Sequence, residues 1–203
     1  MSIVDTKKRE KKKRITEAGY ELFLSEGVNR TSISAITRKA RVAKGTFYLY
    51  FRDKYELKDY IVTRETCDIF LKAINDLEKS SVQGTHEKII FIIDDIINYF
   101  NYFPERLQFI EKNLSWSFLR KVIAENEDEI NIREYIENLL EDSQYVFDNT
   151  ELMVYTILET VNSTCHYVIL YNEPVSLDVL KTYLYKDINS IIDNHIIGRK
   201  DED

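Results

Sequence analysis

Residues 44–57 read KGTFYLYFRDKYEL, and this stretch decides the fold of the N-terminal part of the chain. Phe47 and Phe51 are four residues apart, so on a helix they share one face and can pack against neighbouring helices. Tyr48 and Leu49 then lie toward the opposite side, where they can contact a partner. The stretch therefore predicts a short helix that is buried on one side and exposed on the other.

Two further helical patterns precede this short helix, which we expect at about residues 44–50. The first covers about residues 8–26 and ends at Gly27, a residue that suits a left-handed C-terminal cap. The second covers about residues 32–40. The turn that follows it contains Arg41, and a positive φ at this position would strain an arginine modestly. The sequence thus predicts three small helices packed together.

The rest of the chain also shows helical spacing, and only five glycines and two prolines interrupt its 203 residues. Asp53 and Glu56 have the form of an N-cap and an acid at the third helical position, so a long helix begins there and continues to about residue 79. Further helices are expected at about residues 86–102, 104–125, 128–147, 150–171 and 177–197. The prediction is an all-α protein of about nine helices without strands, in which the long helix joins a three-helix head to a C-terminal bundle.

Charge is divided unevenly along the chain. Residues 1–54 hold 14 Lys and Arg against 6 Asp and Glu, whereas residues 55–203 hold 14 against 29. A basic segment of this size is expected to bind a phosphate backbone, which repels the acidic remainder. We therefore predict a DNA-binding domain at residues 1–54 and a second domain with another task at residues 55–203. A solvated basic tail is the alternative for residues 7–14.

The sequence gives little support for a membrane protein, an exported protein or an enzyme. No run of about 18 apolar residues predicts a membrane span, and the charged N-terminus predicts no export signal, so we expect a cytoplasmic protein. Cys67 and Cys165 are too few and too far apart for a disulfide framework, and we interpret them as free thiols. His86, His166 and His195 lack metal-ligand spacing, and no phosphate loop or nucleophile elbow occurs. We predict no enzyme, cofactor or metal site.

Residues 31–57 read TSISAITRKARVAKGTFYLYFRDKYEL and resemble the DNA-binding domain of the tetracycline-repressor (TetR) family of bacterial transcription factors. The resemblance covers about residues 9–69. Its most specific part is an ordered set of residues: Lys44, Gly45, Thr46, Phe47, Tyr48, Tyr50, Phe51 and Lys54. The family often has glycine where this chain has Arg41, which concerns the geometry of the turn rather than the motif.

A helix-turn-helix of this family predicts how the head contacts DNA. The expected contact residues are Thr31, Ser32, Lys44, Gly45, Thr46, Tyr48, Leu49, Tyr50 and Lys54. Discrimination among base pairs is expected from Thr46, Tyr48 and Leu49 in the major groove. Phosphates are expected at two helix N-termini, one marked by Thr31 and Ser32 and the other by Lys54. Because one short helix makes few base contacts, a two-fold dimer on a palindromic operator is expected.

The resemblance also implies that the last two helices pair with their copies in a second subunit. Apolar residues at helical spacing are the candidates for this interface: Met153, Ile157, Val161, Leu180, Leu184, Ile188 and Ile191. Stripes of this kind also form intramolecular cores, and that alternative stays open.

The resemblance further implies a small-molecule effector among the C-terminal helices. Aromatic residues are the candidates to line its site: Tyr60, Phe70, Tyr99, Phe103, Trp116, Tyr155 and Tyr167. Core packing is the alternative for each of them. Asp94, Asp95, Glu111 and Glu159 interrupt apolar runs, and a carboxylate turned inward would favour a cationic ligand, whereas one turned outward would only be solvated.

Together these observations favour a sequence-specific transcriptional regulator. By the resemblance it is a repressor that a small-molecule effector releases from its operator. The alternative is an all-helical carrier of apolar small molecules that binds no DNA, and the basic segment with its recognition helix argues against it. The sequence determines neither the effector, nor the operator, nor the target genes.

Overall fold

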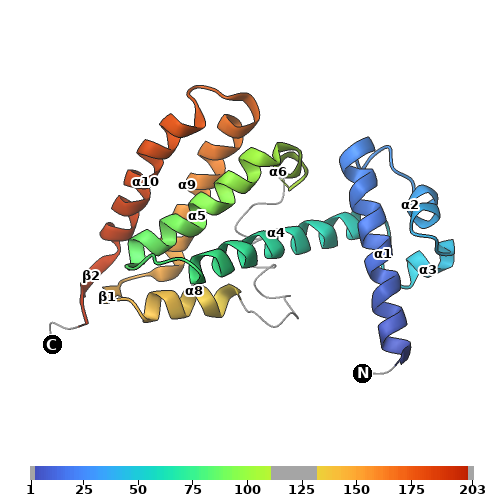
Figure 1. Cartoon of the computed structure of the whole chain (residues 1–203), viewed down its shortest axis with the longest axis horizontal. Helices are drawn as coiled ribbons and strands as arrows, with labels where there is room; N and C mark the ends of the chain where they lie inside the picture. Colours follow the sequence, from blue (N-terminus) through green and yellow to red (C-terminus); the bar gives the residue numbers. More distant parts are fainter. Residues whose placement is uncertain (1–2, 111–131, 201–203) are drawn as a thin grey trace. The chain divides into compact units, whose positions relative to one another are not determined.

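The computed structural model describes residues 3–110 and 132–200, which hold nine helices and one two-stranded sheet (Figure 1). The helices are α1 (Ile3–Glu26), α2 (Ile33–Lys39), α3 (Lys44–Tyr48), α4 (Lys54–Glu78), α5 (Thr85–Tyr102), α6 (Pro104–Ile110), α8 (Ile132–Glu141), α9 (Thr150–Tyr171) and α10 (Leu177–Asn194). The strands are β1 (Tyr145–Phe147) and β2 (Ile196–Arg199). The predicted all-α class is confirmed. Of the helix predicted at 104–125, only α6 falls within the described residues.

The chain divides into two compact units, Met1–Glu65 and Thr66–Asp203. The boundary falls inside α4, so this helix contributes residues to both units. The assignment of DNA binding to residues 1–54, and of effector binding and dimerisation to residues 55–203, stays a prediction.

The first unit is a helical head with one shared core. Buried side chains of this core are Ile15, Ala18, Phe23, Ile36, Ala40, Phe47, Phe51, Leu57, Ile61 and Val62. Gly19 lets α1 and α4 approach closely, because a Cβ atom at this position would lie 2.7 Å from Cδ2 of Leu57. The long helix therefore begins as part of the head.

The turn between α2 and α3 is closed by local hydrogen bonds. The Ser32 side chain caps α2 and accepts a hydrogen bond from the amide of Ala35 (3.1 Å). After α2, Arg41 adopts a left-handed φ of 54°. The amide of Val42 then donates to the carbonyl of Thr37 (3.0 Å). The positive φ considered for Arg41 is thus present in the structure.

Replacing Arg41 by glycine is expected to stabilise the first unit by about 0.5–1 kcal/mol. Left-handed backbone costs a non-glycine residue about 1–2 kcal/mol, and the greater freedom of glycine in the unfolded chain offsets roughly 0.5–1 kcal/mol of the gain. Thermal unfolding followed by circular dichroism measures the change. Arg38→Gly is the control, since Arg38 lies in α2 and should lose stability as glycine. A loss of stability in Arg41→Gly would contradict the inference that the backbone at Arg41 is strained.

The second unit packs α5, α8, α9 and α10 around an aliphatic core. The buried residues of this core are Ile97, Leu140, Met153, Ile157, Cys165, Leu184, Ile188 and Ile192. Helix α10 packs against both α9 and α5. Buried residues are three, four or eight positions apart along α9 and four apart along α10, as expected for helices that turn one face to a core.

A short antiparallel ribbon of β1 and β2 was not predicted. Tyr145 pairs with Arg199, and Phe147 pairs with Ile196. The backbone groups of each strand are satisfied by a partner far away in the sequence, so neither strand has a local signal.

The ribbon shortens two predicted helices. The helix predicted at 128–147 is α8, which ends at Glu141, and the helix predicted at 177–197 is α10, which ends at Asn194. Helical spacing continues past both ends in the sequence, but the backbone beyond them pairs with the other strand instead. Tertiary pairing has overridden the local pattern.

A polar network around Asp94 joins α5 to α10. The Asp94 carboxylate accepts hydrogen bonds from Lys181 Nζ (2.6 Å), from Asn98 Nδ2 (2.9 Å) and from the hydroxyl of Tyr185. Desolvation alone would raise the pKa of Asp94, but the hydrogen bonds from Lys181 and Tyr185 outweigh it, and the pKa lies below its ordinary value. The folded protein therefore favours the ionised carboxylate.

Replacing Asp94 by asparagine is expected to lower the free energy of unfolding by about 1–2 kcal/mol at pH 7. Hydrogen bonds to charged groups contribute about 1.5–3 kcal/mol, and solvent screening reduces this because the side chain is 39% exposed. The pKa is lowered in the folded state, so this stabilisation is present above the unfolded pKa of about 3.9 and is lost as the pH falls further through the folded pKa. Urea unfolding should show a smaller difference at pH 3 than at pH 7. An equal loss of unfolding free energy in Asp94→Asn at both pH values would contradict the stabilising role of the ionised carboxylate.

Candidate DNA-binding surface and effector cavity

Helix α3 buries one side and exposes the other. Phe47 and Phe51 are 0% and 3% exposed, and their ring centroids lie 5.8 Å apart in the core of the head. Tyr48 and Leu49, on the other side, are 52% and 76% exposed. The division between packing and exposed residues predicted from the sequence is confirmed. Exposed apolar surface of this size on such a short helix suggests a contact surface.

The remaining residues of the predicted contact set on α3 are also accessible. Lys44 and Gly45 are exposed, and Thr46 and Tyr50 are half-buried. A Cβ atom at Gly45 would meet no heavy atom within 4 Å. The missing side chain at this position therefore leaves open space beside the helix, so a partner's backbone can approach closely.

Thr31 is corrected as a DNA contact. The side chain is buried, with the residue only 1% exposed, and its hydroxyl donates to the carbonyl of Gly27 (2.9 Å). The hydroxyl closes the loop between α1 and α2 and is not available to a phosphate. Ser32, by contrast, is exposed at the N-terminus of α2.

Lys54 has a structural role that the sequence did not suggest. Its ammonium donates to the carbonyls of Asn29 (2.9 Å) and Thr31 (3.0 Å). Two of the three N–H donors are thereby used to hold the loop before α2 against the start of α4. A phosphate contact at Lys54 would depend on the remaining donor.

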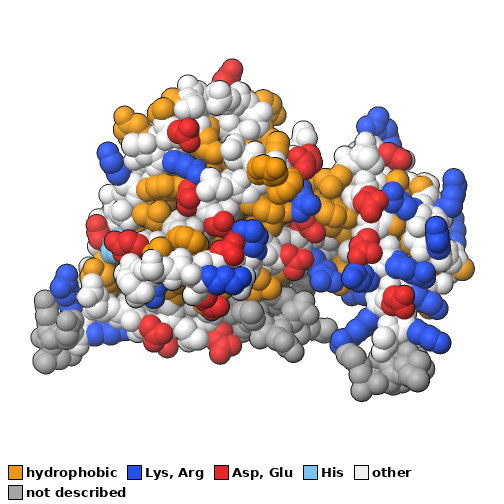
Figure 2. All heavy atoms as spheres, in the orientation of Figure 1, with side chains coloured by type: hydrophobic (Ala, Val, Ile, Leu, Met, Phe, Trp, Pro, Cys, Tyr) orange, Lys and Arg blue, Asp and Glu red, His pale blue; other side chains and the backbone are white. Residues whose placement is uncertain are grey.

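The surface of the first unit is rich in exposed cations, which Figure 2 shows in blue over α1–α3. Exposed residues of this kind are Lys7, Lys8, Arg9, Lys11, Lys13, Arg30, Arg38, Lys39, Arg41, Lys44 and Arg52. Lys39 forms an ion pair with Glu21 (2.6 Å). This surplus of positive charge is typical of a surface that binds nucleic acid.

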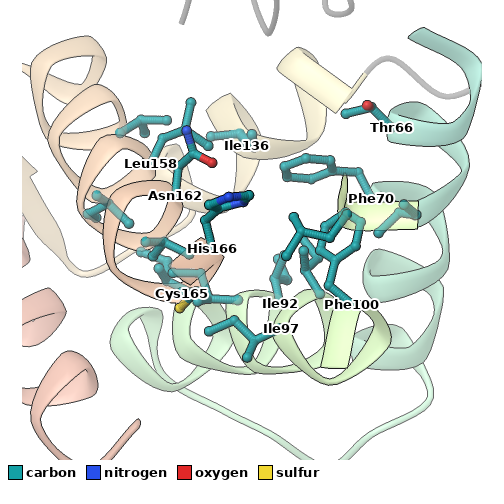
Figure 3. A pocket seen from close by; sticks show the side chains of 18 of the residues that line it. Thr66, Phe70, Ile92, Ile97, Phe100, Ile136, Leu158, Asn162, Cys165 and His166 are labelled. Atoms are coloured by element: carbon teal, nitrogen blue, oxygen red, sulfur yellow. The ribbon is translucent and has the colours of Figure 1, made fainter. Parts of the chain in front are cut away.

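The second unit contains a cavity of about 170 Å³ (Figure 3). Helices α4, α5, α6, α8 and α9 line it, and most of the side chains are aliphatic. The polar residues of the lining are Thr66, Asn162, Cys165 and His166. The described lining contains no Asp, Glu, Lys or Arg. An apolar cavity with a few convergent polar groups is the usual form of a small-molecule site.

Only one of the aromatic residues predicted to line an effector site, Phe70, lies in this lining. Tyr60 belongs to the first unit, where Lys12 Nζ lies 3.9 Å from its ring centroid. Tyr155 and Tyr167 are 40% and 50% exposed. Trp116 lies outside the described residues.

Two further predicted residues, Tyr99 and Phe103, lie at the C-terminal end of α5 and are not among the lining residues. Both pack with Arg106 at the start of α6. The α5 lining consists of Ile89, Ile92, Ile93, Ile96, Ile97 and Phe100. The run of isoleucines in α5 was the available signal, and the preference for aromatic residues missed it.

Four of the seven residues predicted for a dimer interface are buried within the subunit: Met153, Ile157, Leu184 and Ile188. Met153 and Ile157 are buried, and with Val161 they line the cavity. Leu184 and Ile188 are buried in the core, where Leu180 and Ile191 pack against them. For the four buried residues the intramolecular alternative holds. Val161, Leu180 and Ile191 are half-buried, and their place in a dimer interface stays a prediction.

Histidine and cysteine side chains form no metal site in the part of the chain that the structure describes. His86 Nε2 lies 2.9 Å from a carboxylate oxygen of Asp193, and His195 Nδ1 lies 2.6 Å from one of Asp148. Both cysteines are free and buried, and desolvation raises the pKa of the Cys165 thiol to about 11. A thiol of this kind stays protonated and unreactive at neutral pH.

A basic head whose short third helix exposes one side is typical of a helix-turn-helix DNA-binding domain. Residues 15–61 match the family described as bacterial regulatory proteins, tetR family. The N-terminal head of the chain is therefore similar to this family, over about a quarter of the sequence. No helix among the described residues is long and apolar enough to cross a membrane.

Relatives of known sequence match the N-terminal half. An HTH-type transcriptional regulator of Staphylococcus aureus strain USA300 is 29% identical over 91 residues, which are 45% of this chain and 48% of that protein. A regulator of strain N315 matches to the same extent. The chain thus spans about half the length of the curated relatives it matches.

Solved structures share the fold over most of the chain. A TetR-family transcriptional regulator from Streptomyces coelicolor has a TM-score of 0.67 at 16% identity, covering 92% of this chain and 98% of that one. The TetR-family repressor FadR of Thermus thermophilus, in complex with lauroyl-CoA, has a TM-score of 0.63 at 17% identity, covering 95% and 98%. These likenesses establish a common architecture.

Proposed function

We propose that this chain is a sequence-specific DNA-binding transcriptional regulator. The observation that carries the proposal is the geometry of α3, in which Phe47 anchors the helix while Tyr48 and Leu49 stand exposed. A helix held rigidly on one side can present the other to the major groove at a fixed depth. The cations of the same unit supply the attraction for the phosphates.

The contacts divide into two kinds. Thr46, Tyr48 and Leu49 read base edges and thymine methyl groups, because they project from the exposed part of the recognition helix. The other contacts bind the DNA backbone and set the register without reading the base sequence. They come from Ser32, Lys44, Gly45, Tyr50 and the remaining N–H donor of Lys54. Thr31 supports this surface from inside.

The regulator acts as a homodimer through the exposed surface of α9 and α10. Large apolar side chains on this surface include Tyr155 (40%), Tyr167 (50%), Tyr171 (58%), Val179 (45%) and Tyr183 (63% exposed). Exposed aromatic residues on two adjacent helices are typical of an interface rather than of free surface. A two-fold dimer presents two recognition helices to a palindromic operator.

The cavity of the second unit binds an effector that releases the protein from DNA. Thr66 and Phe70 of α4 line the cavity, and the same helix begins at Lys54, which holds the loop before α2. A ligand that prefers one position of α4 therefore favours one arrangement of the heads. The complex of Thermus thermophilus FadR with lauroyl-CoA supports an effector with an apolar part.

Selection of bound sequences from a random double-stranded DNA pool at near-physiological salt tests this function. A palindromic consensus is the expected result. A folded, dimeric protein that enriches no sequence would favour the carrier of apolar molecules instead.

A further inference from the structure

We propose that the effector is a small, uncharged, mainly aliphatic compound whose single polar group hydrogen-bonds with Asn162 and His166 of α9. Only the regulatory role of this ligand rests on the proposed function. The ligand class itself follows from the cavity and can be tested without DNA.

The described lining offers no ionised side chain to a charged ligand. The carboxylates once considered for a cationic ligand are used elsewhere: Asp94 pairs with Lys181, and Asp95 pairs with Lys72 (2.9 Å). Glu159 is not among the lining residues, and Glu111 lies outside the described residues. An ammonium ion or a carboxylate would lose its hydration without gaining a counter-charge.

The polar residues of the cavity determine where the head group of the ligand lies. Asn162 and His166 are four residues apart on α9, so they share one helical face. Figure 3 shows the His166 ring directed into the cavity with Asn162 beside it, opposite Phe70 and Ile92. An amide and an imidazole offer both donors and acceptors. They can therefore bind a hydroxyl, ketone or ester oxygen, while the aliphatic side chains surround the rest.

The volume of the cavity limits the size of the ligand. A cavity of about 150 Å³ lined by Leu, Ile and Phe holds a benzene ring, and the volume here is about 170 Å³. The body of the ligand therefore has on the order of six to ten carbon atoms before the helices must move apart.

Calorimetric titration of the full chain with 1-octanol, octanoate and octylammonium tests the ligand class, since these probes share one chain and differ in the head group. We expect 1-octanol to bind at least about tenfold more tightly than either ion at pH 7.5. Equal or tighter binding of octanoate, or failure of 1-octanol to bind, would overturn the proposal. Selection of DNA sequences, done separately, decides the regulator function.

Variants test the head-group site. His166→Leu and Asn162→Leu should each weaken 1-octanol about tenfold while leaving the binding of toluene, which has no head group, within about threefold. Ile92→Phe, which fills the cavity, should abolish both. Gln108→Leu, on the exposed surface of α6, is the matched control and should bind both probes as the wild type does. Unchanged 1-octanol affinity in both Leu variants of α9 would overturn the assignment of the head group.

Discussion

Replacing Tyr48 and Leu49 together by alanine is expected to abolish sequence-specific DNA binding and to leave the fold intact. Both side chains are more than half exposed, so little core packing is lost, although Tyr48 gives up an edge contact with Phe47. A good base contact contributes about 1–3 kcal/mol, and a dimer makes it twice, so the affinity for the selected operator should fall at least about 100-fold. Fluorescence anisotropy with labelled operator measures the loss.

The control for this variant is another exposed aromatic residue. Tyr102 is 78% exposed in the second unit, and Tyr102→Ala should keep operator affinity within about twofold. Lys54 is left in place because its hydrogen bonds to Asn29 and Thr31 support the head. A Lys54 variant could lose DNA affinity through a less stable head as well as through a lost DNA contact. If the double variant still protects the same operator, the recognition surface has been assigned to the wrong residues.

Replacing Tyr167 and Tyr183 together by glutamate is expected to convert the dimer into a monomer. The two residues lie on α9 and α10 and are 50% and 63% exposed in the subunit. Dimerisation would bury four carboxylates, two from each subunit, and unpaired buried charge costs several kcal/mol. The dimer dissociation constant should rise at least about 1000-fold, as sedimentation velocity measures. Operator affinity should fall with it.

A charge outside the proposed interface separates the two possible effects. Tyr102→Glu adds one glutamate to α5, half the charge that the double variant adds, and should leave the protein dimeric. A glutamate double variant that remains a dimer at micromolar concentration would show that subunits associate through another surface.

The sequence alone determined the head. Its helices are short and consecutive, and each is marked locally: Ser32 caps α2, Arg41 stands in the turn, and Phe47 and Phe51 lie one helical turn apart. Local signals of this kind survive in a single sequence, because they depend on neighbours within four residues. The proposed recognition surface was predicted from the same spacing and from the family resemblance.

Only the tertiary structure decided which apolar faces of the second unit turn inward. The helical spacing of Met153, Ile157 and Val161 shows that they share a face of α9, but it does not predict what that face packs against. The structure turns this face to the cavity, whereas Tyr155 and Tyr167, which were predicted to line a pocket, are exposed. The ribbon of β1 with β2 depends on segments far apart in the chain. Contacts of this kind arise from three-dimensional packing, so no local pattern encodes them.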